Sequence, residues 1–309
     1  MVTIRKIQTI LHSEEFVPMA SLQNILSFII ADHNAPLKWN ELVDAILKTC
    51  QIAEQHSVIP YYFFETTEGL QSFALSKDLV SLEKSNAISV NGTIQIDNKK
   101  KILDNAYKLS YSFQKSLREA LVKPLQAKAK STYITHIPFR NTARSNNLLY
   151  TTGYEGTTID SFFKKLVENS IEQLIDVRKN PISRKFGFSK KILSATCSAL
   201  GISYKHYPEL GIPSENRQQL NSQSDYIKLF TNYERNILPQ NQDVIHSVIN
   251  DARLQTSALL CYESDSAQCH RSSLAKYISK LTDSKNTESG HNEREEKNSH
   301  NGKIIPRNI

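Results

Sequence analysis

Residues 148–280 alternate four short apolar runs with helix-like segments, and this alternation limits the possible folds more than any other feature of the chain. The intervening segments repeat apolar residues at helical spacing, whereas the runs are continuous and short, as buried strands are. The four runs are "LLYTTGYEG", "IEQLIDVRKNP", "ISYKHYPELG" and "TSALLCYE". Strands that alternate with helices favour a parallel sheet covered on both faces, so this segment is predicted to be an α/β domain spanning about residues 148–281.

Polar side chains gather at or just after the end of each predicted strand. In chain order they are Tyr154 and Glu155, then Asp176 and Arg178, then Tyr204, His206 and Glu209, and lastly Cys261 and Glu263. The carboxyl ends of parallel strands meet at one edge of the sheet, which is where such sheets bind ligands. The sequence therefore predicts one polar pocket at this edge.

Four blocks that contain these residues occur in a fixed order: "TTGYEG", "DVRKNPISRKFGFSKK", "YKHYPELG" and "LLCYESDSAQCHR". Through them the chain resembles the family called domain of unknown function 488, over roughly residues 148–280. The resemblance implies a Rossmann-like fold with a shared polar pocket and fusion to a helical or winged-helix segment. It also implies a loose link to DNA repair or defence, and it assigns no reaction.

An anion is the ligand that the predicted pocket favours. Cys269, His270 and Arg271 are expected to open the last helix, whose free backbone N–H groups and positive dipole end would face the cleft. Arg178 and Arg184 add positive charge nearby in the sequence. The phosphate of a nucleotide is the expected anion.

Roles follow from residue type. The catalytic candidates are Tyr154, Glu155, Asp176 and Cys269; the ligand-binding candidates are Arg178, Ser183, Arg184, Tyr204, His206, Glu209, Cys261, Glu263, His270 and Arg271. Cys269 is the favoured nucleophile because a helix amino terminus and Arg271 would lower its pKa. Structural explanations stay open: Asp176 and Arg178 can form an ordinary ion pair, and Cys261 can be a small buried residue.

Two other chemistries fit the residue types less well. "LIDVR" followed by a strand-end cysteine resembles the rhodanese arrangement, but no glycine follows Cys261 to let backbone amides curl around a persulfide. A zinc site from Cys261, Cys269, His270 and His206 is possible by type, but seven residues between the two cysteines are not a standard zinc spacing. No metal site is predicted, and the sequence identifies no cofactor.

Residues 1–98 are predicted to form a winged-helix-like α+β domain. Two helical patterns, "SLQNILSFIIADH" and "WNELVDAILKTCQIA", are followed by a helix near Ser72 to Leu82 and by two short strands joined at Asn91-Gly92. That dipeptide favours a tight hairpin. The pattern resembles the winged-helix modules of bacterial regulators and antitoxin-like proteins. Such a module docks nucleic acid or protein.

Residues 99–147 are strongly basic. Up to residue 144 the segment holds eleven Lys or Arg against two acids, a local excess of nine positive charges, whereas the whole chain carries +7. Ile102, Leu109 and Phe113 recur at helical intervals, so an amphipathic helix up to Pro124 and then a linker are predicted. A basic face of this kind either binds phosphate groups or is simply a solvated helix surface. Lys99, Lys100 and Lys101 are the nucleic-acid-binding candidates.

The remaining expectations concern the tail and the cellular location. Residues 282–309 are polar, without an apolar face, and are predicted to be a disordered tail. The first residues, "MVTIRKIQTILHSEEF", do not read as a secretory signal, and no run approaches the length of a membrane span. With only four cysteines, reduced thiols and a cytoplasmic location are expected.

These features predict a nucleic-acid- or nucleotide-associated protein, most simply an enzyme with a phosphate-binding pocket in its α/β domain and a first domain that docks the partner. The alternative is a non-enzymatic regulator or binder whose pocket senses a nucleotide-like ligand. Neither the reaction nor the oligomeric state follows from the sequence.

Overall fold

The computed structural model describes residues 21–33, 36–66, 69–137, 148–217, 220, 222–288 and 303–309. The chain divides into two compact units, Met1–Thr135 and His136–Ile309. In the described residues, no helix combines the length and the apolar character needed to cross a membrane.

The first unit mixes helices with two small sheets. Its elements are α2 (Leu22–His33), β1 (Leu37–Lys38), α3 (Trp39–Gln55), β2 (Phe63–Thr66), β3 (Gly69–Gln71), α4 (Phe73–Lys84), β4 (Ile88–Val90), β5 (Thr93–Ile96), α5 (Lys99–Ala106), α6 (Tyr111–Leu121), α7 (Ala127–Tyr133) and β6 (Ile134–His136). One sheet has the order β1-β5-β4 and the other β3-β2-β6.

The predicted helices and hairpin of the first unit are present. α4 covers the predicted stretch from Ser72, whose hydroxyl caps the helix by accepting from the N–H of Leu75. β4 and β5 pair antiparallel on either side of the Asn91-Gly92 turn, where Gly92 has φ of 73°. The β2–β3 pair between α3 and α4 was not expected. The assignment of this unit to the winged-helix class stays a prediction.

The basic segment differs from the single helix and linker that its pattern predicts. It forms α5, α6 and α7, and α6 starts afresh after Ser110, whose side chain caps it. Ile102, Leu109 and Phe113 are buried as expected, and α5 and α6 pack against α2 and α3. Residues 99–135 therefore belong to the first unit, because their apolar stripe completes that unit's core. The rest of the predicted linker, residues 138–147, lies outside the described residues.

The second unit is an α/β domain built around a parallel sheet. Its elements are β7 (Leu148–Gly153), α8 (Ile159–Glu168), β8 (Gln173–Asp176), α9 (Lys190–Ala199), β9 (Ser203–His206), α10 (Gln223–Asn232), α11 (Gln242–Leu254), β10 (Ser257–Cys261), α12 (His270–Glu288) and β11 (Ile305–Asn308), with short helical turns between β9 and α11. The five strands have the order β11-β7-β10-β8-β9, and every neighbouring pair is parallel.

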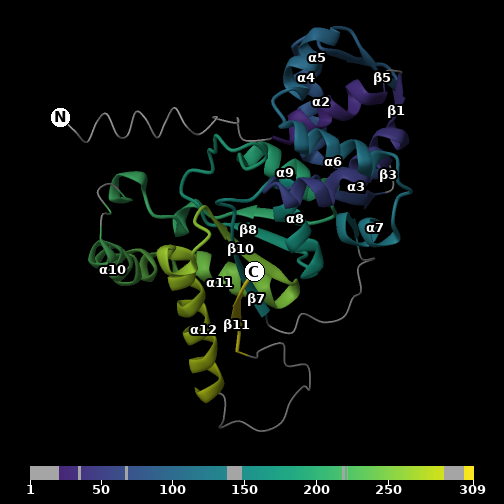
Figure 1. Cartoon of the computed structure of the whole chain (residues 1–309). Helices are drawn as coiled ribbons and strands as arrows, with labels where there is room; N and C mark the ends of the chain where they lie inside the picture. The colour runs from purple at the N-terminus through teal and green to yellow at the C-terminus, as the bar shows by residue number, and fades with distance from the viewer. Residues whose placement is uncertain are drawn as a thin grey trace, which may run out of the picture. The chain divides into compact units, whose positions relative to one another are not determined.

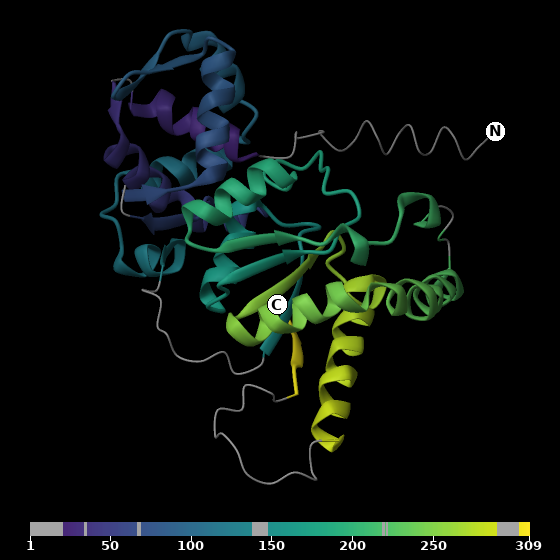
Figure 2. The same ribbon diagram turned by 180° about the vertical axis from the view of Figure 1, so that it is seen from behind.

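Helices cover both faces of this sheet, as the continuous apolar strands predict (Figures 1 and 2). α11 and α12 lie on one face, where Leu149, Ile175 and Leu259 pack against Val248 and Leu274. α8 and α9 lie on the other face (Figure 1). All residues of β8 and β10 are buried. The predicted fold class and its four strands are thus confirmed.

The predicted disordered tail is wrong for the residues that the structure describes there. α12 continues to Glu288, and residues 305–308 form β11, which pairs with β7 at the edge of the sheet. Ile304 is fully buried beside β11, and its N–H donates to the hydroxyl of Thr282 on α12. An isolated apolar pair, Ile304 and Ile305, was too short a signal to identify a strand.

Candidate anion-binding site

An ion pair between Asp176 and Arg178 forms the centre of the site, at the end of β8. The Arg178 Nε donates to Asp176 Oδ1 at 2.8 Å, and Nη2 donates to Oδ2 at 2.6 Å. Asp176 is fully buried and Arg178 is 5% exposed. Two-point contact in a dry environment holds the guanidinium in one orientation.

Two tyrosines and an aromatic ring complete this arrangement. The remaining Arg178 nitrogen, Nη1, donates to the Tyr154 hydroxyl and to the Phe188 carbonyl, both at 2.9 Å. Tyr204 donates its hydroxyl proton to Asp176 Oδ2 at 2.6 Å. The Tyr154 ring stacks on Phe188, with centroids 4.2 Å apart. Burial and the Asp176 carboxylate raise the pKa of Tyr204 well above its usual value, so its phenol stays protonated.

The loop after β10 packs directly on the loop after β7. The backbone N–H groups of Tyr154 and Glu155 donate to the Tyr262 carbonyl at 3.1 and 2.9 Å. Gly153 lies so close to the Glu263 carbonyl oxygen that a Cβ at this position would be 1.8 Å away. Only glycine fits there, which explains why the first strand ends in this residue.

A second cluster lies between β10 and the start of α12. We call it the thiol cluster: Cys261, Glu263, Cys269 and His270. Cys261 Sγ is 2.9 Å from Glu263 Oε2 and 3.5 Å from His270 Nδ1. Arg217, from the turn Ser214–Arg217, donates to Glu263 Oε1 at 2.7 Å and reaches His270 Nδ1 at 2.9 Å.

The two thiols differ in acidity. Burial raises the pKa of Cys261, but contacts with Cys269, His270 and Arg217 outweigh it and hold the pKa well below the usual value. Burial and the neighbouring Cys261 raise the pKa of Cys269 well above the usual value, and Arg271 lowers it too little to compensate. The start of α12 therefore does not lower the pKa of Cys269 as expected, because it is buried. Of the two thiols, Cys261 is the one whose ionised form is favoured.

A pocket of about 320 Å³ opens beside these groups, and we call it the strand-end pocket. Its described lining consists of Tyr154, Arg178, Lys179, Asn180, Ile182, Ser183, Arg184, Ile212, Arg217, Cys261 and Tyr262. Five of the predicted site residues, namely Tyr154, Arg178, Ser183, Arg184 and Cys261, thus line one cavity. The described lining includes four basic side chains and no carboxylate.

Other predicted residues serve the site indirectly or lie away from it. His206 Nε2 is 2.9 Å from the Arg178 carbonyl, and its Nδ1 is 3.1 Å from Lys190 Nζ. Glu155 is exposed and accepts from the N–H and hydroxyl of Ser264. Glu209 is exposed in the turn Pro208–Leu210 and does not contribute to the described lining.

Arg271 does not have the predicted role. It is fully buried, and its guanidinium donates to the backbone carbonyls of Glu263 and Ser264. Arg271 satisfies buried carbonyl groups of the loop and is not part of the described lining of the strand-end pocket. α12 does begin at His270, as predicted, but its first turn lies against the loop.

Sequence reasoning missed Arg217, Lys179 and Tyr262. Arg217 lies in an irregular stretch, 46 residues before Glu263 and 53 before His270, and no periodic pattern connects them. Lys179 and Tyr262 each follow a predicted strand-end residue directly. Both would have been found by including the residue that follows each predicted strand-end residue.

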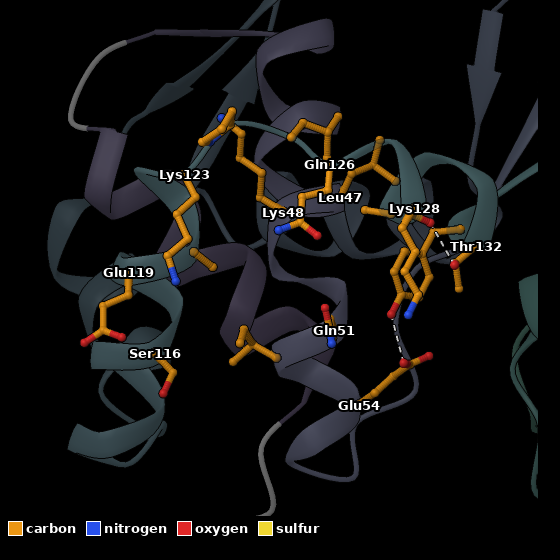
Figure 3. A pocket seen from close by; sticks show the side chains of 16 residues that line it. Leu47, Lys48, Gln51, Glu54, Ser116, Glu119, Lys123, Gln126, Lys128 and Thr132 are labelled. Carbon is orange, nitrogen blue, oxygen red and sulfur yellow. Dashed lines mark hydrogen bonds between the residues drawn. The ribbon is translucent and has the colours of Figure 1, made fainter.

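A larger pocket in the first unit has a different character. It measures about 350 Å³ and lies among α3, α6 and α7. Lys48, Lys123 and Lys128 line it together with Glu54 and Glu119 (Figure 3). Glu54 accepts from the Tyr133 hydroxyl at 2.8 Å. Because acids offset the lysines here, this pocket is a poorer anion site than the strand-end pocket.

Comparison with known proteins agrees with the residues that suggested a family. The model of the family described as Domain of unknown function DUF488 matches residues 158–278. No curated protein and no solved structure matches the chain. The match covers most of the sheet, the residues Asp176 and Arg178, and the whole thiol cluster. The similarity to this family is therefore confined to the second unit.

Proposed function

We propose that this is a nucleic-acid- or nucleotide-associated protein that holds a phosphate group in the strand-end pocket. The observation that carries the proposal is the charge of the described lining: Arg178, Lys179, Arg184 and Arg217, with no carboxylate. Such a cavity attracts anions, and guanidinium groups match the geometry of phosphate oxygens.

The four basic residues divide into two kinds. Arg178 and Arg217 are each paired with an acid, Asp176 and Glu263, which holds them in place and offsets their charge. Lys179 and Arg184 are exposed, and neither forms an ion pair with an acidic side chain of the described residues. These two supply the net positive charge, and the paired arginines supply oriented donors.

Aromatic groups at the pocket favour a nucleotide over simple phosphate. Tyr262 lines the pocket and is 46% exposed, so part of its ring is accessible to a ligand. Tyr154 is buried, with one face covered by Phe188. Stacking of a base on an exposed tyrosine contributes about 1–3 kcal/mol and tolerates any base.

One observation favours a binder that senses this ligand over an enzyme that transforms it. The catalytic candidates Tyr154 and Asp176 are buried and hydrogen-bonded to Arg178, so they position a binding group. Cys269 is also buried. Enzymatic action on the ligand stays a prediction, and its test is turnover of a bound nucleotide followed by product analysis.

The binding proposal is tested by calorimetry on the full chain with inorganic phosphate, nucleoside mono- and triphosphates, and a short oligonucleotide with or without a 5′-phosphate. Arg184→Ala should weaken binding about tenfold or more, since a hydrogen bond to a charged group contributes about 1.5–3 kcal/mol. Arg235→Ala removes another exposed arginine, outside the described lining, and should leave affinity unchanged.

Two results would contradict the proposal. One is affinity that does not depend on the phosphate of the ligand. The other is an equal response to Arg184→Ala and Arg235→Ala, which would show that general surface charge, and not the strand-end pocket, attracts the ligand.

A further inference from the structure

The thiol cluster brings together four side chains that bind metal ions. One ligand atom from each of Cys261, Glu263, Cys269 and His270 lies within 4.8 Å of all the others. The two cysteines and the histidine are almost completely buried. A sulfur-rich group of this composition, shielded from water, suits zinc better than it suits calcium or magnesium, which prefer oxygen ligands.

The orientation of His270 points to a ligand at its Nδ1 atom. Its Nε2 is 3.1 Å from the Val177 carbonyl oxygen, which can only accept, so Nε2 carries the proton. Nδ1 faces the Arg217 guanidinium at 2.9 Å and the two sulfur atoms at 3.5 and 4.0 Å. Histidines that bind metals have their other ring nitrogen held by a carbonyl or carboxylate in this way.

The spacing between the sulfur atoms and the histidine nitrogen fits a tetrahedral ion. Zinc binds sulfur at about 2.3 Å and nitrogen at about 2.0–2.1 Å, which places sulfur and nitrogen ligands about 3.5 Å apart at a tetrahedral angle. Cys261 Sγ lies 3.5 Å from His270 Nδ1, and Cys269 Sγ lies 4.0 Å from the same atom. The two sulfur atoms are thus close to their positions around such an ion.

Glu263 and Arg217 complete the coordination and the charge. Glu263 directs Oε2 at Cys261, while its other oxygen, Oε1, accepts from Arg217. Oε2 accepts from the Cys261 thiol and becomes available to a metal once that thiol loses its proton, while the other oxygen is held in place. Two thiolates and a carboxylate carry three negative charges, and a divalent ion with the Arg217 guanidinium carries three positive ones, so the loaded site is neutral.

We propose that Cys261, Glu263, Cys269 and His270 bind a zinc ion with four protein ligands. Zinc sites of this closed kind are structural. The ion fastens the loop between β10 and α12 to the end of β10, and this loop supplies Tyr262 to the strand-end pocket. The site uses Glu263 in place of His206, whose Nε2 lies against the Arg178 carbonyl. Arg217 releases His270 Nδ1 to the metal and keeps its contact with Glu263.

The test measures metal content and the spectrum of the cobalt form. The full chain, purified without chelator, should carry one zinc per molecule, and Co²⁺ in its place should give intense visible bands with thiolate-to-cobalt charge transfer. Cys261→Ser and Cys269→Ser should each lower zinc affinity at least tenfold and change the spectrum. Cys197→Ser removes a buried cysteine outside the thiol cluster and should change neither.

A second set of measurements tests the proposal even if the cysteine variants do not fold. A chelator should lower the thermal midpoint of the wild-type chain, and added zinc should restore it. Glu263→Gln, at a partly exposed ligand, should shift the cobalt bands, whereas His206→Gln should not. Absence of stoichiometric zinc binding by the wild-type chain, or an unchanged cobalt spectrum in the Cys261→Ser and Cys269→Ser variants, would overturn the proposal.

Discussion

Asp176 Oδ2 lies 2.6 Å from Arg178 Nη2, and Tyr204 donates to the same oxygen at the same distance. The carboxylate thus links β8 and β9 beside the strand-end pocket. Its partner Arg178 reaches the pocket, while Asp176 itself is fully buried. The acid therefore acts through the arginine that it orients.

Neutralising Asp176 should destabilise the second unit as well as weaken anion binding. Asp176→Asn leaves the Arg178 guanidinium buried without its counter-ion, which costs about 3–5 kcal/mol. Glu168→Gln removes the acid of the solvent-exposed pair with Lys164 and should cost at most about 1 kcal/mol. Urea unfolding of the full chain compares the two. Equal losses of unfolding free energy in the two variants would show that the buried ion pair does not stabilise the fold.

Gly153→Ala tests the close contact between the loops after β7 and β10. The new methyl group would overlap the Glu263 carbonyl, so the loop must move, at a cost at or above the ~1–3 kcal/mol of overpacking. Gly156→Ala is the matched control: it meets no atom within 4 Å but has φ of 71°, where alanine costs about 1–2 kcal/mol. Gly153→Ala should be the more destabilising change and the only one that lowers ligand affinity. A larger effect at Gly156 would contradict this account.

Ile304→Ala should destabilise the second unit by about 2–5 kcal/mol, because this side chain is fully buried in the core between the sheet and α12. Ile305, the next residue, is 51% exposed, and Ile305→Ala should cost less than about 1 kcal/mol. Thermal or urea unfolding distinguishes them, and hydrogen exchange should show faster exchange in β7 for the Ile304 variant. Similar stabilities would mean that β11 contributes little to the fold.

Charge reversal in α5 tests the basic segment as a nucleic-acid surface. The Lys99→Glu, Lys100→Glu, Lys101→Glu variant should bind a short duplex or single strand more weakly. The plot of log affinity against log salt should also be shallower, because each lost phosphate contact removes about 0.7–0.9 from the slope. Measurements by fluorescence anisotropy over a range of salt give both values.

The matched control reverses three exposed basic residues of the second unit, Lys228, Arg235 and Lys276, for the same change in net charge. It should leave the slope close to that of the wild type. Undetectable nucleic-acid binding at low salt by the wild-type chain would rule out this surface.

Strand positions were predictable because buried parallel strands leave a strong local pattern. β7, β8, β9 and β10 fall inside the four apolar runs, and the polar residues after them meet at one edge, as parallel topology requires. The direction of individual side chains was not predictable. Cys261 and Cys269 share one cluster, yet Arg271, two residues further on, turns toward the loop backbone.

The failures share a physical cause, which is dependence on contacts distant in sequence. Arg217 joins the site by packing of an irregular turn, and β11 exists because β7 offers a free edge. Likewise, the residues after Pro124 were predicted to be a linker because they show no apolar stripe, although α7 packs against α3. Local periodicity cannot report such partners.

Pairing between residues 305–308 and β7 spans more than 150 positions, as the hydrogen bond from Thr151 to Asn308 shows. During synthesis, the ribosome must translate this last strand before β7 has neighbours on both sides. Until then the nascent sheet exposes an open edge, which is the kind of surface that pairs with other chains. Because closure of so long a loop is slow, a newly made molecule is open to pairing with other chains along β7 until β11 has docked.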